Sequence, residues 1–215
     1  MTGITIERRG AVSVVTIDRP DRLNALDEPT RLALAAAIES EAADDAVGAV
    51  VLTGSGRAFC VGQDLAATHE LDDCADTVGR TYNPIARAIV AADVAVVAAV
   101  GLAPDTGASW YLARRIGHAR AFEFATSGQR LSADRAVELG LANAVVAPER
   151  LLEEALDRAT ALAAGPRRAF ALTKRALREA EQGSLDDALE REAEFQGIAG
   201  RDREHLERRA AFLAR

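Results

Sequence analysis

The chain has 215 residues and a formal net charge of −7 at pH 7, so its length predicts one globular domain with room for an extension. The hydrophobic fraction is 49% and the aromatic fraction 4%, which predicts a core built mainly from Ala, Val and Leu. The negative charge argues against nucleic acid as a partner. Cys60 and Cys74 fit neither a disulfide framework nor a zinc site, and His69, His118 and His205 show no metal or triad spacing.

The sequence carries no pattern typical of export or membrane insertion. It does not open on a basic segment followed by an apolar one, and Arg87 and Asp93 interrupt the long apolar run at 85–100. A membrane span needs about 18 uninterrupted apolar residues. We therefore expect a cytoplasmic protein without a membrane partner.

Apolar periodicity predicts strands and helices in alternation. Strands are expected at 4–8, 11–17, 47–52 and 94–100, helices at 29–42 and 82–92, and a polar segment at 66–79. Helices at 110–116, 119–126 and 133–140 follow, then a short strand at 143–146. The rest is helical from 148, with breaks near 165–166 and 182–184, where Ser184 caps the next helix with Asp187. The expected organisation is an α/β core over 1–146 and a helical C-terminal region over 147–215.

The segment 57–65, which reads RAFCVGQDL, follows the strand at 47–52 and the glycine turn at 53–56. Gly62 allows the backbone to bend so that neighbouring N–H groups point outward and do not pair in a ladder. An exposed N–H at the end of a strand is what an oxyanion hole requires. The residues alone leave open whether this turn is functional or only a turn.

This segment resembles the crotonase signature of the enoyl-CoA hydratase/isomerase superfamily, whose members bind acyl-CoA thioesters. Four further segments match in order: 4–18 is similar to the opening hairpin and 19–26 to the first CoA-binding loop. Residues 101–110 resemble the second active-site loop, and 131–146 the helix–turn–strand after the core. The resemblance implies a ββα spiral core with a C-terminal helical extension.

The resemblance also assigns the candidate site residues. It implies that the N–H of Gln63 is an oxyanion donor and that Lys174 and Phe212, on the tail, reach CoA; a solvated helix lysine is an equal alternative for Lys174. The remaining implied CoA contacts are Arg22, Leu23, Asn24, Ala25, Val61, Gly62, Asp64, Leu65 and Ala66. It further implies a homotrimer or hexamer, no metal, and no cofactor besides the CoA thioester that is the substrate.

Asp105, within 104–107, is the candidate acid–base residue. By itself an aspartate here favours a helix cap. The resemblance favours the isomerase branch, similar to ring-epoxide phenylacetyl-CoA isomerases and some Δ3,Δ2-enoyl-CoA isomerases. A carboxylate with a raised pKa can take a proton α or γ to a thioester and return it elsewhere. We expect an isomerase; the alternatives are an enoyl-CoA hydratase and a degenerate crotonase that binds CoA or a partner without turnover.

The sequence departs from the family pattern where Val100 runs directly into Gly101. Family members have roughly 35 further residues here, about one turn of a repeating spiral. That segment supplies the second oxyanion N–H and the first of two glutamates with which hydratases activate water. No glutamate lies between Val100 and Asp105, which disfavours the hydratase. Two interpretations of the gap remain open: either the chain lacks this segment, or the sequence omits residues that the molecule contains. The continuous numbering favours a genuine deletion.

Overall fold

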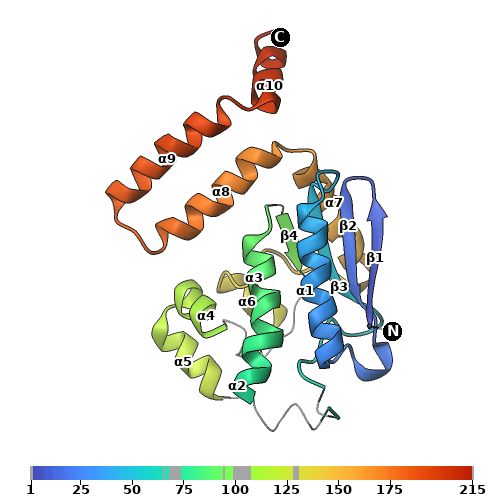
Figure 1. Cartoon of the computed structure of the whole chain (residues 1–215). Helices are drawn as coiled ribbons and strands as arrows, with labels where there is room; N and C mark the ends of the chain where they lie inside the picture. The colour runs from blue at the N-terminus through green and yellow to red at the C-terminus, as the bar shows by residue number, and fades with distance from the viewer. Residues whose placement is uncertain are drawn as a thin grey trace.

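The computed structural model describes residues 2–64, 66–67, 74–93, 95–98, 108–127 and 131–214 (Figure 1). The N-terminal half contains β1 (Ile4–Arg9), β2 (Val12–Ile17), the 3-10 turn η1 (Pro20–Arg22), α1 (Glu28–Ala43), β3 (Ala49–Gly54), α2 (Cys74–Thr77), the π-helix η3 (Val78–Tyr82), α3 (Asn83–Ala91) and β4 (Ala95–Ala98). The C-terminal half contains α4 (Ala108–Ile116), α5 (His118–Ser127), α6 (Ala133–Glu138), η4 (Pro148–Arg150), α7 (Leu151–Ala163), α8 (Arg167–Ala180), α9 (Leu185–Ala199) and α10 (Arg203–Leu213).

The four described strands form one sheet in the order β1-β2-β3-β4. The first two make an antiparallel hairpin in which Ile4 pairs with Ile17. The other pairs are parallel, and Val51 lies between Val14 and Val97. Parallel pairs need crossover connections, and the sequence supplies them as α1 and as the helical segment ending in α3.

Strands β2 and β3 are buried on both faces of the sheet. On one face, side chains such as Val15 and Val50 pack with α1 and α3 in one apolar cluster. On the other face, Val12 and Val51 pack against Ala159 of α7. A strand covered on both sides is apolar at most positions, which explains why neither sequence alternates regularly; the polar exceptions are Ser13 and Thr16 in β2 and Thr53 in β3.

The helical tail leads away from the sheet: α8 and α9 lie side by side and α10 stands at the far end (Figure 1). The predicted cap of α9 is confirmed as a capping box between Ser184 and Asp187. A further break was not predicted. Helix α9 ends at Ala199 with Gly200 as its C-cap, and Asp202 caps α10 by accepting a hydrogen bond from the Glu204 N–H at 2.9 Å. Within the described ranges no helix is long and apolar enough to cross a bilayer.

The predicted strand at 143–146 is wrong, because these residues are irregular and Val145 is 49% exposed. Among the described residues, no strand lies beyond β4 to pair with this segment. Local β propensity is a weak preference that needs a neighbouring strand to become structure.

Candidate active site

The loop after β2 is shaped by two residues with left-handed backbone, Leu23 at φ 51° and Asn24 at φ 60°. Asparagine tolerates this conformation better than most residues, because its short side chain can form local hydrogen bonds. Asn24 is fully buried; its Oδ1 accepts from the N–H of Arg19 at 2.8 Å. Its Nδ2 donates to the carbonyls of Ser55 at 2.8 Å and Ala58 at 2.6 Å. Asn24 therefore fastens its own loop to the segment that enters the signature turn.

Arg19 provides a second connection between the two loops. Its guanidinium lies 2.9 Å from both the Asp27 and the Asp64 carboxylates and donates to the Ala25 carbonyl. Burial opposes ionisation of Asp27, but hydrogen bonds from Thr30 and the charge of Arg19 lower its pKa. The other oxygen of Asp64 accepts from the N–H of residue 66 at 3.1 Å. Asp64 thus holds the turn in place, and both of its oxygens are in use.

The signature turn and the loop meet in one isolated parallel bridge between Leu26 and Gln63. The Leu26 N–H donates to the Gly62 carbonyl at 2.8 Å, and the Asp64 N–H donates to the Leu26 carbonyl at 3.1 Å. In a parallel bridge of this kind, Leu26 forms its hydrogen bonds with the residues before and after Gln63, and the backbone groups of Gln63 itself take no part. The N–H of Gln63 therefore points to the opposite side, as an oxyanion donor must. Gly62 makes this possible with φ +96°, which L side chains rarely adopt.

The side chain of Gln63 adds an unusual feature to the bridge. Its Nε2 is shielded from solvent and has no hydrogen-bond partner among the residues that the structure describes. Cys60 beside it is buried in the core, and its Sγ accepts from the Gly62 N–H at 3.3 Å. Burial raises the pKa of the Cys60 thiol. The side chain packs in the core and supports the turn through this hydrogen bond.

Sequence reasoning missed Arg31, which is fully buried in α1. Its guanidinium donates to the Leu26 carbonyl and to the Thr81 hydroxyl, both at 2.7 Å, and lies 4.5 Å from the centre of the Tyr82 ring. The carbonyl that receives the Asp64 N–H is therefore also held by Arg31. The sequence does contain a signal for this residue. Arg31 precedes Leu34 by three positions, a spacing that places both side chains on the same helix face, toward the core.

The predicted site residues fall into three groups. The loop 22–25 and the turn 61–64 are brought together by the contacts above, while Val61 is 55% exposed. Leu65 and Asp105 lie outside the described residues. On the tail, Phe212 is 75% exposed, and Lys174 donates to the carbonyls of residues 89 and 92 at 2.7 and 3.0 Å. Burial, and then the charge of Arg178, lower the pKa of Lys174. Among the described residues no hydrogen bond or ion pair joins Lys174 or Phe212 to the signature turn.

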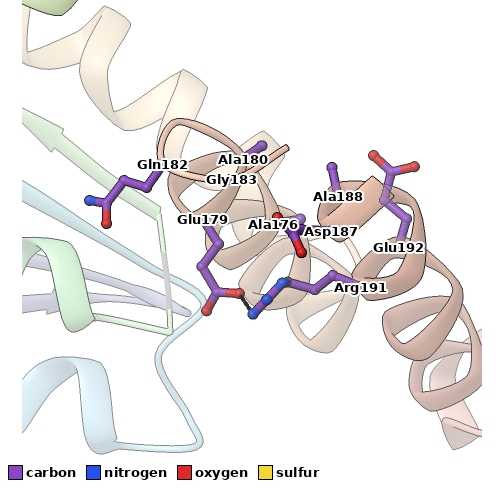
Figure 2. Close-up of a pocket in the computed structure, with 9 residues that line it drawn as sticks. All are labelled: Ala176, Glu179, Ala180, Gln182, Gly183, Asp187, Ala188, Arg191 and Glu192. Carbon is purple, nitrogen blue, oxygen red and sulfur yellow. Dashed lines mark hydrogen bonds and ion pairs between the residues drawn. The ribbon is translucent and has the colours of Figure 1, made fainter. Parts of the chain in front are cut away.

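A separate hollow lies between α8 and α9, and Figure 2 shows that the side chains of Glu179 and Arg191 face one another there. Glu179 pairs with Arg191 and, at 2.8 Å, with Arg175, and Asp187 binds Ser184 at 2.7 Å. No residue of the signature turn lines this hollow. In the described ranges no group of His, Cys, Asp and Glu side chains is suited to hold a metal.

The family described as "Enoyl-CoA hydratase/isomerase" matches residues 7–101 and 99–214. The chain belongs to this family. It is 33% identical to the 1,2-epoxyphenylacetyl-CoA isomerase of Escherichia coli (strain K12) over 242 residues, covering 95% of this chain and 92% of that protein. It is 27% identical to the short-chain-enoyl-CoA hydratase of Clostridium acetobutylicum over 251 residues, covering 99% and 95%.

The fold is shared as well. A crystal structure of an enoyl-CoA hydratase from Polaromonas sp. JS666 superposes with a TM-score of 0.90 at 27% identity, covering 98% of this chain and 96% of that chain. This confirms the predicted crotonase fold with its helical extension.

The comparisons also locate the gap in the chain. The family match comes in two parts that meet at residues 99–101, where Val100 runs into Gly101. An alignment of 242 residues that covers 95% of a 215-residue chain leaves several dozen of its positions without a counterpart here. The two parts therefore join where the sequence predicts a missing turn of the spiral.

Proposed function

We propose that this chain isomerises an acyl-CoA, moving a double bond or rearranging a ring epoxide through a thioester enolate. The observation that carries the proposal is the Leu26–Gln63 bridge, which turns the N–H of Gln63 away from its own sheet partner. A base removes a proton from the carbon next to the thioester, and the electron pair moves onto the carbonyl oxygen. The N–H of Gln63 stabilises that oxyanion until the proton returns elsewhere.

Asp105 is the proposed base. It lies outside the described residues, so its assignment rests on the loop motif at 101–110 and on the printed activity of the E. coli relative. A single carboxylate that takes the proton and later returns it leaves the atoms of the substrate unchanged in number, as an isomerisation requires.

CoA binding is proposed for the joined loops 22–25 and 61–66, which the hydrogen bonds of Asn24 and the ion pairs of Arg19 hold together. We propose a homotrimer or hexamer, in which Phe212 of the exposed helix α10 reaches the CoA of a neighbouring subunit. Light scattering at micromolar concentration tests the assembly, and a monodisperse monomer contradicts it.

Two alternatives belong to the same fold. Hydration is supported by the Clostridium acetobutylicum relative, whose name gives that activity. It requires an activated water, and the chain has no glutamate between Val100 and Asp105 to provide a base there. The second alternative is a crotonase that binds CoA without turnover; it would keep the joined loops and lack only catalytic activity.

The test compares wild type with Asp105→Asn on a 3-enoyl-CoA and an aryl-epoxide-CoA, with product masses recorded. The asparagine keeps the size and much of the capping ability but cannot take a proton, so kcat should fall by a factor of about 100 or more with unchanged melting temperature. Asp157→Asn, on the exposed face of α7, is the matched control. Equal rates in wild type and Asp105→Asn would mean that Asp105 is only a helix cap. A product 18 mass units heavier than the substrate indicates hydration. CoA binding by wild type without any product favours the alternative without turnover.

A further inference from the structure

We propose that Arg31 is a positioning residue of the oxyanion site: its guanidinium holds the Leu26 carbonyl, and through Leu26 it sets the direction of the Gln63 N–H. The inference rests on the proposed function, because that N–H is the proposed oxyanion donor. Arg31 is fully buried, so it acts through the bridge between Leu26 and Gln63 and not by contact with the substrate.

The first step is the burial of a charged side chain. Among the residues that the structure describes, Arg31 is the largest whose side chain is fully buried. Its neighbours on the same face of α1, Leu34 and Ile38, are apolar core residues. A buried charge is costly even when its donors are bound, and an apolar side chain of similar size fills the same space without that cost. The arginine therefore calls for a role that an apolar side chain cannot perform.

The second step is the carbonyl that Arg31 binds. The Leu26 carbonyl accepts from the Arg31 guanidinium at 2.7 Å and from the Asp64 N–H at 3.1 Å, which uses both of its lone pairs. The Leu26 N–H donates to the Gly62 carbonyl at 2.8 Å. Because the C=O and N–H of a trans peptide point in opposite directions, the bound Gly62 carbonyl turns the Gln63 N–H outward. A shift of Leu26 therefore changes the direction of that N–H.

The third step is the anchor behind the carbonyl. The same guanidinium donates to the Thr81 hydroxyl at 2.7 Å and lies 4.5 Å from the centre of the Tyr82 ring. Both residues belong to the π-helix η3, which leads into α3, and α3 packs beside α1 (Figure 1). The planar fork of an arginine can span two such contacts. Leu26 is therefore tied to a packed helix and not only to its own loop.

The chemistry sets the expected size of the effect. A donor that is held in place before the substrate arrives stabilises the developing oxyanion without reorganisation. Displacing it weakens binding of the transition state more than binding of the substrate, so kcat should fall while KM changes little. A misplacement of about 1 Å can lower a rate about 100-fold, and for a residue that acts through another we expect about tenfold.

The substitution Arg31→Met removes the guanidinium without leaving its partners unbound. The Leu26 carbonyl keeps the Asp64 N–H, and the Thr81 hydroxyl keeps its own acceptor, the Thr77 carbonyl, at 2.6 Å. Methionine is unbranched and flexible, so it fills much of the space that the stem of the arginine occupied. We therefore expect a folded variant.

The experiment compares wild type with Arg31→Met, Arg31→Lys and the matched control Ile38→Val. The control truncates a fully buried side chain two turns further along α1 and leaves every hydrogen bond of the bridge in place. Three quantities are measured: the melting temperature, kcat and KM on a 3-enoyl-CoA, and the infrared stretching frequency of bound butyryl-CoA labelled with carbon-13 at the thioester carbonyl. That frequency falls as hydrogen bonds polarise the carbonyl, and it needs no turnover.

We expect wild type to lower the carbonyl frequency of the bound thioester. Arg31→Met should keep only part of this shift and lose about tenfold in kcat with little change in KM. Arg31→Lys keeps the charge but replaces the fork by a single point donor, so its values should lie between those of wild type and Arg31→Met. Ile38→Val should melt at a lower temperature but keep the kcat and the carbonyl frequency of wild type.

Arg31→Met with wild-type kcat and carbonyl frequency overturns this inference alone. Arg31→Lys with wild-type values also overturns it, because the fork is then dispensable, and this variant decides the question if the methionine variant does not fold. Failure of both variants to fold, or an equal loss of kcat in Ile38→Val, overturns it too, because the arginine is then only structural. A wild type that binds butyryl-CoA without a change in carbonyl frequency overturns the proposed oxyanion site itself.

Discussion

Replacing Asn24 by alanine tests whether the two loops of the candidate site are fastened as the structure shows. The substitution removes the acceptor of the Arg19 N–H and the donor to the Ser55 and Ala58 carbonyls. Each buried group left without its partner costs about 1–3 kcal/mol, and the three are not additive because they share one side chain. With the left-handed backbone at φ 60° adding about 1 kcal/mol for alanine, we expect a loss of roughly 3–5 kcal/mol in the free energy of unfolding.

Asn24→Gly separates the two causes, because glycine adopts the left-handed backbone freely but restores none of the hydrogen bonds. It should lose about 1 kcal/mol less than the alanine variant. Equilibrium urea unfolding followed by circular dichroism measures both, with Asn143→Ala in the exposed segment after α6 as the control. The control should change by less than about 0.5 kcal/mol. A loss below about 1 kcal/mol in Asn24→Ala would refute the assigned hydrogen bonds.

Three further predictions concern binding, pH and the gap. Acetyl-CoA should raise the melting temperature of wild type, and Gly62→Val should abolish this shift. The control Gly10→Val, which also replaces a glycine with positive φ but at the β1–β2 turn, should keep the shift. Equal shifts in wild type and Gly62→Val would place CoA elsewhere. The folded-state pKa of Asp27 is lowered, so its contribution to stability is present above the unfolded value near 3.8 and disappears as pH falls through the folded pKa. Asp27→Asn should remove this part of the pH dependence from the free energy of unfolding, measured by urea unfolding at acidic pH. An intact mass spectrum should give 22.7 kDa; a mass several kilodaltons higher would show that the missing turn exists.

The buried Arg31 shows why one part of the site escapes sequence reasoning. The sequence shows Arg31 as a charged residue on the otherwise apolar face of α1. Its partner Leu26 is close in sequence, but Thr81 and Tyr82 lie 50 and 51 residues away. Only folding brings the π-helix η3 against α1, so the role of the arginine depends on a contact that no local pattern encodes.

The sequence by itself determined the family, the strands of the sheet, the cap at Ser184 and the bend at Gly62, since these depend on periodicity and on backbone preferences of single residues. The tertiary structure decided the rest. Among the described residues, it left 143–146 without a strand partner and the Gln63 Nε2 without a hydrogen-bond partner, and it set Leu26 against Gln63 so that one N–H faces outward. Each of these depends on which atoms meet across long stretches of chain. Local propensities bias the backbone, but hydrogen bonds between distant residues decide where each donor points.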